Sequence, residues 1–338
     1  MRIAPFAGLG GPDDVTVQDV DDPDPEPAEA VVSVRACSLN RHDLWILEGE
    51  SAMVDTEKLP FLSGLDVAGV VESVGERVDA VSPGDRVVLF PNETCGRCRY
   101  CREGPENLCE EFSLYHGGFA EKAAVPADRL VHLPDGVGMT SAAALPTAYV
   151  TAWRMLRRAR VTAGDLVFVP GATGGVGVAS VQLVDVLGAR SIGTSTSAEK
   201  LERIEELGAD HTIRSADPDV LEAELREIGE TDAVLNHLGG EYTDLGLRTL
   251  RRGGRMVVCG RTAGATSEID VPAMFLNHLQ LIGSTMGTQG DLERLVGLVA
   301  DGTLEPVIGG EYALEETGRA FADMQDRERV GKLVVQPN

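Results

Sequence analysis

Lysine is scarce in this 338-residue sequence, and long apolar runs are missing. Only four of the thirty basic residues are lysines, whereas fifty-four residues are acidic, and the formal net charge is −24. No stretch approaches the roughly 18 consecutive apolar residues that a membrane helix needs, and no secretory signal is visible at the start. We therefore expect a cytoplasmic protein. Its acidic surface repels nucleic acid and anionic membranes, so neither is expected as a partner.

The excess of acidic residues over lysines also indicates an environment. A strongly charged surface stays hydrated in concentrated salt, where counter-ions screen the repulsion between like charges. The composition therefore predicts a halophilic, prokaryotic source. An ordinary acidic protein is the alternative.

Cysteine is concentrated in one segment. Four of the six cysteines follow the spacing C-x2-C-x2-C-x7-C, at Cys95, Cys98, Cys101 and Cys109. Four thiolates on one short loop match a closed tetrahedral zinc site. Because they fill all four positions, the single Zn²⁺ that we expect is structural rather than catalytic. An iron–sulfur cluster is the alternative.

The length and the apolar pattern predict two domains of an α/β protein. The first 140 residues are β-rich, with strands expected at 15–17, 30–34, 67–71 and 86–90 and a short helix at 44–47. From about Leu145 strands alternate with helices, which predicts a doubly wound parallel sheet covered on both faces. The helices are expected at 147–160, 199–207, 220–228, 245–251 and 292–298, and the strands at 166–169, 190–194, 211–213, 232–236, 255–259, 279–284 and 332–335.

A glycine-rich turn lies at the start of the alternating part, in Asp165–Gly177 (DLVFVPGATGGVG). An apolar strand, a glycine turn and a helix in succession are the context of a dinucleotide site. Gly174 allows a pyrophosphate to approach the backbone, and Gly177 allows the helix to pack near the strand. The first N–H groups of the helix, around Gly175 and Val176, then face the phosphates. An ordinary βα turn is the alternative.

The residues after the second strand indicate which nicotinamide cofactor is bound. Enzymes that use NAD place an acidic residue there, about 20 residues beyond the glycines, to bind the ribose 2′-hydroxyl. Here the place is taken by Ser195, Thr196 and Ser197, and Lys200 follows. Hydroxyls and a cation accommodate a 2′-phosphate, so NADP(H) is expected. Arg214 is either a further phosphate contact or a surface arginine.

These features together resemble the medium-chain dehydrogenase/reductase superfamily over the whole chain. The matching landmarks are Pro60–Val70, Pro83–Val87, the cysteine lobe, Gly117–Glu121, Ala144–Pro146, the phosphate turn, Gly253–Arg255 and Gly331–Lys332. The resemblance implies a β-rich GroES-like catalytic domain and a Rossmann domain. The expected bounds are 1–147 with the zinc lobe at about 92–112, completed by 286–338, for the former and 148–285 for the latter.

The resemblance also indicates the branch of the superfamily. The positions of the catalytic zinc ligands in alcohol dehydrogenases fall on Asn40, Leu65 and Thr147, and leucine cannot coordinate a metal. Asn40-x-x-Asp43 with the phosphate turn is instead similar to the quinone oxidoreductases, which lack this zinc. An unorthodox metal site built from Cys37, His42, Asp43 and Asp66 is the alternative. Otherwise Asp66 is expected only to anchor a loop.

The resemblance implies hydride transfer between the nicotinamide and a small molecule. We expect a quinone or an activated alkene or carbonyl as acceptor, with the developing oxyanion stabilised by hydrogen-bond donors. The candidate catalytic residues are Asn40, His42, Asp43 and Thr147, and Tyr115 is a further candidate donor. His42 is either the proton donor or a satisfied polar residue beside Asp43. Thr151, Gly260 and Thr262 are expected beside the nicotinamide, and Lys332 is a further candidate for cofactor binding.

Two other functions are consistent with the sequence, an alcohol or aldehyde dehydrogenase and a nucleotide-binding sensor without turnover. The apolar strand around 279–284 is an exposed sheet edge that relatives pair across a two-fold axis, so a homodimer or homotetramer is expected. The remaining histidines show no ligand spacing and are interpreted as scattered: His116, His132, His211, His237 and His278.

Overall fold

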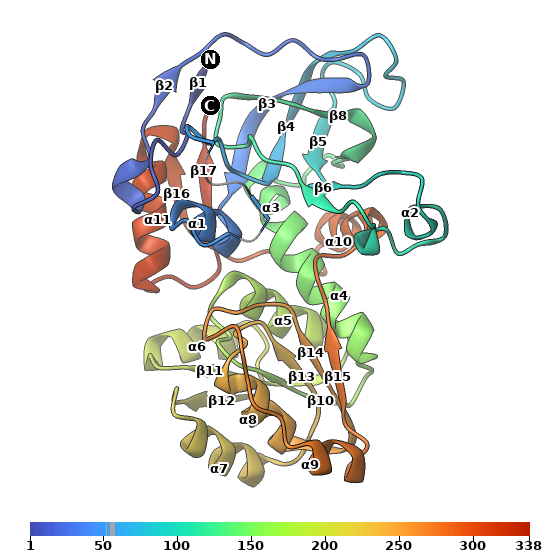
Figure 1. Ribbon diagram of the computed structural model, residues 1–338, viewed down its shortest axis with the longest axis vertical. Coiled ribbons are helices and arrows are strands. Elements are labelled where there is room, and N and C mark those ends of the chain that lie inside the picture. Colours follow the sequence, from blue (N-terminus) through green and yellow to red (C-terminus); the bar gives the residue numbers. More distant parts are fainter. Residues whose placement is uncertain (52, 55–57) are drawn as a thin grey trace. The chain divides into compact units, whose positions relative to one another are not determined.

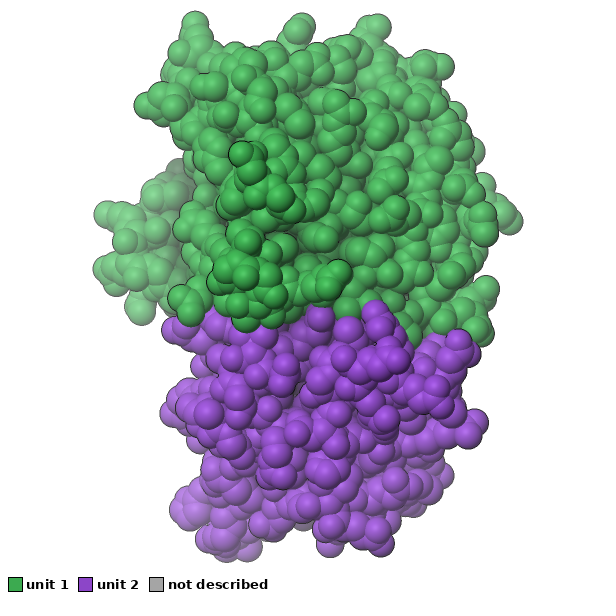
Figure 2. All heavy atoms as spheres, turned by 180° about the vertical axis from the view of Figure 1, so that it is seen from behind, with its two compact units in different colours: residues 1–150, 287–338 green, residues 151–286 purple. Residues whose placement is uncertain are grey.

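The computed structural model describes residues 1–51, 53–54 and 58–338. Their contacts divide them into two compact units (Figure 2). Unit 1 comprises residues 1–150 and 287–338, and unit 2 comprises residues 151–286. Among the described residues, no helix combines the length and the apolar character needed to cross a membrane.

Unit 2 is built around a six-stranded parallel sheet with the strand order β12-β11-β10-β13-β14-β15 (Figure 1). The order reverses at β10, so the right-handed crossovers place α5 and α6 on one face and α7 and α8 on the other. The predicted doubly wound Rossmann sheet is confirmed. Its elements are α4 (Val150–Ala159), β10 (Leu166–Val169), α5 (Gly175–Val186), β11 (Arg190–Ser195), α6 (Ala198–Glu206), β12 (His211–Arg214), α7 (Pro218–Ile228), β13 (Thr231–Asn236), α8 (Glu241–Thr249), β14 (Leu250–Val258), α9 (Val271–Leu276) and β15 (Gln280–Gly283).

Burial explains the composition of the central strand. All four residues of β10 are buried, because neighbouring strands flank it and helices cover both faces of the sheet. One prediction next to this sheet is wrong: the expected helix 245–251 ends at Thr249, and Leu250 begins β14. Leu250 pairs with Thr231 and is buried in the core, so sheet pairing outweighs local helix propensity there.

Unit 1 is built around a mostly antiparallel sheet with the order β16-β17-β3-β4-β5-β9, to which β8 adds by pairing with β3. Only β16 and β17 pair in parallel. The elements are β1 (Arg2–Ile3), β2 (Gln18–Asp19), β3 (Glu29–Ser38), α1 (Arg41–Leu47), β4 (Asp66–Val74), β5 (Arg86–Leu89), β6 (Asn92–Glu93), α2 (Arg99–Glu103), β7 (Ser113–Leu114), β8 (Lys122–Pro126), β9 (Leu130–His132), α3 (Met139–Ala144), a π-helical turn (Leu145–Tyr149), α10 (Gln289–Ala300), β16 (Ile308–Ala313), α11 (Thr317–Asp326) and β17 (Lys332–Gln336).

The end of the chain completes the core of unit 1. Phe321 of α11 packs edge-on against Phe6 and Phe119, with ring centroids 5.5 and 5.7 Å apart. β17 pairs with β3 at Val334 and Ser38, so the start of β17 lies beside the end of β3. The expected strand 15–17 is wrong, because Val15 forms only an isolated bridge with Phe6.

Candidate functional site

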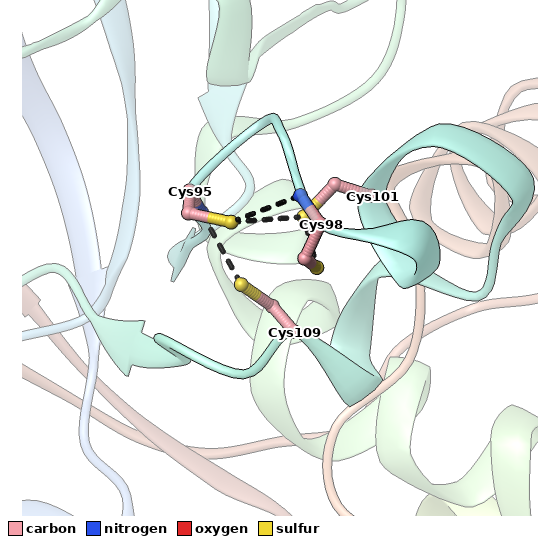
Figure 3. Close-up of side chains that lie close together, drawn as sticks. All are labelled: Cys95, Cys98, Cys101 and Cys109. Atoms are coloured by element: carbon pink, nitrogen blue, oxygen red, sulfur yellow. Dashed lines mark hydrogen bonds between the residues drawn. The ribbon is translucent and has the colours of Figure 1, made fainter.

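Four thiols converge in the cysteine lobe of unit 1 (Figure 3). The sulfur atoms of Cys95, Cys98, Cys101 and Cys109 all lie within 4.8 Å of one another. A tetrahedral zinc site with Zn–S bonds of about 2.3 Å requires sulfur atoms about 3.8 Å apart. The Sγ atoms of Cys98 and Cys101 are 3.5 Å apart, and those of Cys95 and Cys101 are 4.0 Å apart. The donor set and its spacing therefore fit one zinc ion.

Backbone N–H groups hold these sulfur atoms in place. The N–H groups of Cys95 and Glu111 donate to Sγ of Cys109 at 3.2 and 3.3 Å, and the N–H of Cys98 donates to Sγ of Cys95 at 3.4 Å. Such donors stabilise thiolate charge, which a metal-bound cysteine carries. Among the described residues, no other group of three or more metal-ligating side chains converges in this way.

The glycine turn of unit 2 has the geometry of a phosphate site. Gly171 has a φ of +64°, and a Cβ atom at Gly177 would lie 2.4 Å from its carbonyl oxygen, so the close approach requires glycine. A Cβ at Gly174 would meet only that oxygen, at 3.9 Å, so the space beside Gly174 is open. Gly174 is the N-cap of α5 and brings no capping side chain, so the first N–H groups of the helix remain available to an anion.

The predicted 2′-phosphate residues lie together at the ends of β11 and β12. Ser195 pairs with Arg214 in the sheet, and the Arg214 guanidinium donates to the carbonyl of Thr196 at 3.2 Å. Ser197 accepts the N–H of Lys200 and thereby caps α6. Hydroxyl groups and an exposed arginine are therefore placed side by side, at the carboxyl edge where open α/β sheets bind ligands.

The loops after β13 and β14 form the neighbouring part of the same edge. A Cβ at Gly260 would lie 2.1 Å from the carbonyl oxygen of His237, so these loops touch through backbone. Thr262 lies in the loop after β14. A Cβ at Gly171 would lie 3.5 Å from Nε2 of His237, whose Nδ1 atom is buried and has no hydrogen-bond partner among the described residues. Thr151 is buried, and its hydroxyl contacts the sulfur of Met286 at 3.9 Å.

In unit 1 a buried carboxylate joins four segments, at the end of β3, the start of β4, the π-helical turn and the start of β17. Asp66 is fully buried and accepts hydrogen bonds from Ser38 at 2.8 Å, Asn40 at 2.9 Å and Thr147 at 2.6 Å. The ammonium group of Lys332 lies 3.5 Å from the same carboxylate. We call Ser38, Asn40, Asp66, Thr147 and Lys332 the polar cluster.

Lys332, which the sequence predicts to bind the cofactor, lies buried in this polar cluster, and its role toward the cofactor stays a prediction. Its side chain is 4% exposed, and its ammonium donates to the carbonyl of Leu39 and to Oδ1 of Asn40, both at 2.6 Å, besides facing Asp66. Burial lowers the pKa of Lys332, and the charge of Asp66 opposes that shift. Its three protons have three oxygen neighbours within unit 1, so this placement does not support a contact to a nucleotide phosphate.

Asp43, a predicted catalytic residue, is buried and engaged by donors of unit 1. Its carboxylate accepts the N–H of Asn40 at 2.8 Å, the hydroxyl of Ser63 at 2.6 Å and the N–H of Gly64 at 3.1 Å. Burial raises the pKa of Asp43 to about 6, although these donors act in the opposite direction. Asp43 therefore ties the start of α1 to the segment that leads into β4.

The predicted oxyanion donors already donate hydrogen bonds to other groups of unit 1. The Asn40 amide donates to Asp66 and, at 3.4 Å, to the carbonyl of Ser38, and the one hydroxyl proton of Thr147 goes to Asp66. Tyr115 packs against the core, and burial raises the pKa of its phenol. By contrast, Nε2 of His42 is buried and has no hydrogen-bond partner among the residues that the structure describes.

A catalytic metal does not fit these residues. Leu65 is fully buried in the core, and Asn40 and Thr147 direct their protons at Asp66. The Lys332 ammonium lies 3.5 Å from Oδ2 of this carboxylate, and its positive charge would repel a divalent cation there. The alternative site with Cys37 is not formed either, because Cys37 lies buried in the core and no such group converges among the described residues.

Three residues of the site were missed by the sequence reasoning. The sequence suggests either a loop anchor or a member of an alternative metal site for Asp66, a cofactor contact for Lys332 and no role for His116. A weak signal existed for the first two, since each is a charged residue at the start of a buried apolar strand. His116 carries no such signal, because only folding brings it to α1.

The chain matches two family models, described as "Alcohol dehydrogenase GroES-like domain" over residues 26–135 and "Zinc-binding dehydrogenase" over residues 175–301. An acryloyl-coenzyme A reductase of Metallosphaera sedula is 33% identical over 327 residues, covering 94% of this chain and 95% of that protein. A quinone oxidoreductase of Mus musculus is 30% identical over 348 residues, covering 99% and 97%. A crystal structure of an NAD-dependent alcohol dehydrogenase has a TM-score of 0.92 at 33% identity, with 100% of both chains covered.

Proposed function

The chain belongs to the medium-chain dehydrogenase/reductase superfamily, and from this membership we propose that it transfers hydride from NADPH to a conjugated acceptor without a catalytic metal. Its homologues are oxidoreductases that act on small molecules, so an oxidoreductase activity is the general part of this function. The acceptor class is the specific part. A quinone, an enone and an α,β-unsaturated thioester share a carbonyl conjugated to the reacting carbon.

One observation carries the proposal. The carboxylate next to the usual zinc-ligand position, Asp66, is bonded by three hydroxyl or amide donors and faces a buried ammonium. Among the described residues the only converging group of metal-ligating side chains is the four cysteines of the lobe. This supports hydrogen bonds as the means of stabilising the oxygen of the acceptor. In a conjugated acceptor the developing negative charge spreads over several atoms. The donors therefore have less charge to stabilise at the oxygen than they would have with a localised alkoxide.

The residues at the carboxyl edge of the unit 2 sheet support a preference for NADPH over NADH. When bound, NADPH supplies the hydride. The N–H groups at the start of α5 would bind the pyrophosphate, and Ser195, Ser197, Lys200 and Arg214 would surround the 2′-phosphate. An acidic residue would repel that phosphate, and β11 ends in serine. NADPH is therefore expected to bind more tightly than NADH.

The experiment is an acceptor panel in molar potassium chloride. Quinones, enones, enoyl thioesters, aldehydes and alcohols are offered with NADPH, NADH or the oxidised cofactors, and zinc is counted per chain. We expect NADPH oxidation with conjugated acceptors and one zinc per chain. Alcohol oxidation that a chelator abolishes, together with two zinc ions per chain, would establish the alcohol dehydrogenase instead. Tight NADPH binding without turnover of any acceptor would establish a sensor.

We also propose that two copies associate through unit 2. β15 is an edge strand, and the adjoining helix α9 exposes Val271, Phe275 and Leu276 by 64, 63 and 59%. Exposed apolar edges of this kind need cover. Light scattering should give at least twice the monomer mass, and Phe275→Asp should reduce it. Val220→Asp, at a valine of α7 that is 43% exposed, is the control.

A further inference from the structure

Two histidines from distant parts of unit 1 form a stacked pair, and one of them, His42, follows Asn40 of the polar cluster by two residues. His42 lies in the first turn of α1, and His116 lies in the segment after β7. Their rings stack with centroids 5.5 Å apart and planes 27° apart. Phe61 packs edge-on against His116 at 5.0 Å. The apolar ring of Phe61 therefore packs against one of the two stacked polar rings.

In each ring of the pair, one buried nitrogen atom has no hydrogen-bond partner among the described residues. These atoms are Nε2 of His42 and Nδ1 of His116. An unsatisfied buried polar group costs about 1–3 kcal/mol, and folded proteins keep few of them. These two atoms lie on stacked rings, and the donors of the polar cluster are all engaged. The two atoms therefore indicate a ligand that forms hydrogen bonds with them.

The charge of the two imidazole rings indicates which class of ligand they bind. Burial lowers the pKa of His42 to about 4, and burial together with the neighbouring ring lowers the pKa of His116 to about 4. The nearest carboxylate in the sequence, Asp43, is turned toward Ser63 and Gly64. Both rings are therefore neutral at pH 7, and each can present one N–H group. Two neutral donors suit an uncharged carbonyl oxygen better than a free carboxylate.

We propose that His42 and His116 together bind the carbonyl oxygen of an uncharged conjugated acceptor and stabilise the negative charge that develops on it. This inference rests on the proposed function and assigns its oxygen-binding residues. Nε2–H of His42 and Nδ1–H of His116 are the two donors. Because the nitrogen atoms are enclosed, a hydrogen bond made there is stronger than one made in water. Asn40 and Thr147 do not bind this oxygen, and instead hold Asp66 in place through hydrogen bonds.

The test uses side chains that imitate one nitrogen of histidine. The amide nitrogen of asparagine takes the place of Nδ1, and that of glutamine takes the place of Nε2. We expect His116→Asn and His42→Gln to keep kcat/KM within about threefold for NADPH with 2-cyclohexen-1-one or duroquinone. His116→Leu, His42→Leu and the exchanged amides His116→Gln and His42→Asn should lose roughly 100-fold, mostly in kcat. His132→Leu, at an exposed histidine of β9, is the matched control.

A second measurement does not require turnover. With ¹⁵N-labelled histidine in the zinc-loaded full chain, 2-cyclohexen-1-one added with NADP⁺ should shift Nε2 of His42 and Nδ1 of His116 and leave His132 unchanged. If these shifts occur but no acceptor is reduced, the pair is a carbonyl site and the proposed hydride transfer fails. If acceptors are reduced while neither nitrogen shifts and the leucine variants keep kcat/KM, the pair has no such role. Folding of each variant is checked by its melting temperature.

Discussion

Asp66 and Lys332 form a buried ion pair whose partners come from opposite ends of unit 1. Both side chains are at most 4% exposed, and the carboxylate takes further hydrogen bonds from Ser38, Asn40 and Thr147. Removing one member of such a pair leaves a buried charge without compensation, which costs more than the pair contributes. The cluster is therefore expected to be far more sensitive to substitution than any surface ion pair of this acidic protein.

Replacing Lys332 tests this directly. Lys332→Met should lower the free energy of unfolding by about 3–5 kcal/mol, because Asp66 keeps its charge without its cation. Lys122→Met is the control, since Lys122 bridges the exposed carboxylates of Asp22 and Glu72 and should cost less than about 1 kcal/mol. Urea unfolding in fixed salt measures both. Equal losses in the two variants would contradict the special position of Lys332.

The neutral histidines make unfolding pH-dependent. The pKa values of His42 and His116 are lowered to about 4 in the folded chain, so the unfolded chain binds more protons between roughly pH 6.5 and 4. Stability is then lost as the pH falls through this window, by about 2 kcal/mol per ring at pH 5. Asp43, whose pKa is raised to about 6, acts in the opposite direction, because the folded state takes up its proton first.

The size of this effect can be isolated in one variant. His116→Leu should lose about 2 kcal/mol less than the parent chain between pH 7 and pH 5, since one fewer ring has to be charged. Urea unfolding at the two pH values measures the difference. His132→Leu, at a histidine whose side chain is 58% exposed, is the control substitution. An unchanged pH dependence in His116→Leu would show that His116 is not held neutral.

The cysteine lobe is a small element with little structure of its own. It contains the short helix α2 and the strands β6 and β7, and apart from Cys109 its ligands are only partly buried. Elements of this size lack a core, so we expect the metal to hold the lobe together.

Loss of one ligand should therefore release zinc and loosen the lobe alone. In Cys98→Ser we expect the zinc content to fall from one per chain toward zero and a protease to cut within residues 92–112. Cys259→Ser, at a cysteine outside the lobe, should keep its zinc. Elemental analysis and limited proteolysis measure the two effects. Full zinc retention in Cys98→Ser would contradict a four-thiolate site.

Charge is the property that involves the whole chain. With a net charge of −24, repulsion between surface carboxylates opposes the folded state unless ions screen it. We expect the melting temperature to rise as potassium chloride is increased from 0.1 M toward molar levels. Calorimetry of the zinc-loaded protein measures this, with sucrose at equal osmotic strength as the control. A falling melting temperature would contradict the salt adaptation inferred from composition.

Local patterns alone were sufficient for much of this protein. The strand, glycine turn and helix of residues 166–186 and the spacing of the four cysteines each depend on neighbours in sequence, and the family landmarks followed from them. Periodicity also predicted the parallel sheet, because helices and strands leave different apolar repeats. It failed at Leu250, where a partner strand decides the conformation.

The tertiary structure alone decided which residues of the candidate site meet. Asp66 and Lys332 are 266 residues apart, and His42 and His116 are brought together only when the loop after β7 reaches α1. No local pattern encodes such contacts, because they depend on the order of strands in the sheet. Folding also decided which donors are already engaged: the hydroxyl of Thr147 donates to Asp66, whereas Nε2 of His42 has no partner in the described part of the chain. Hydrogen-bonding capacity is a property of the assembled site, whereas residue type is a property of the sequence.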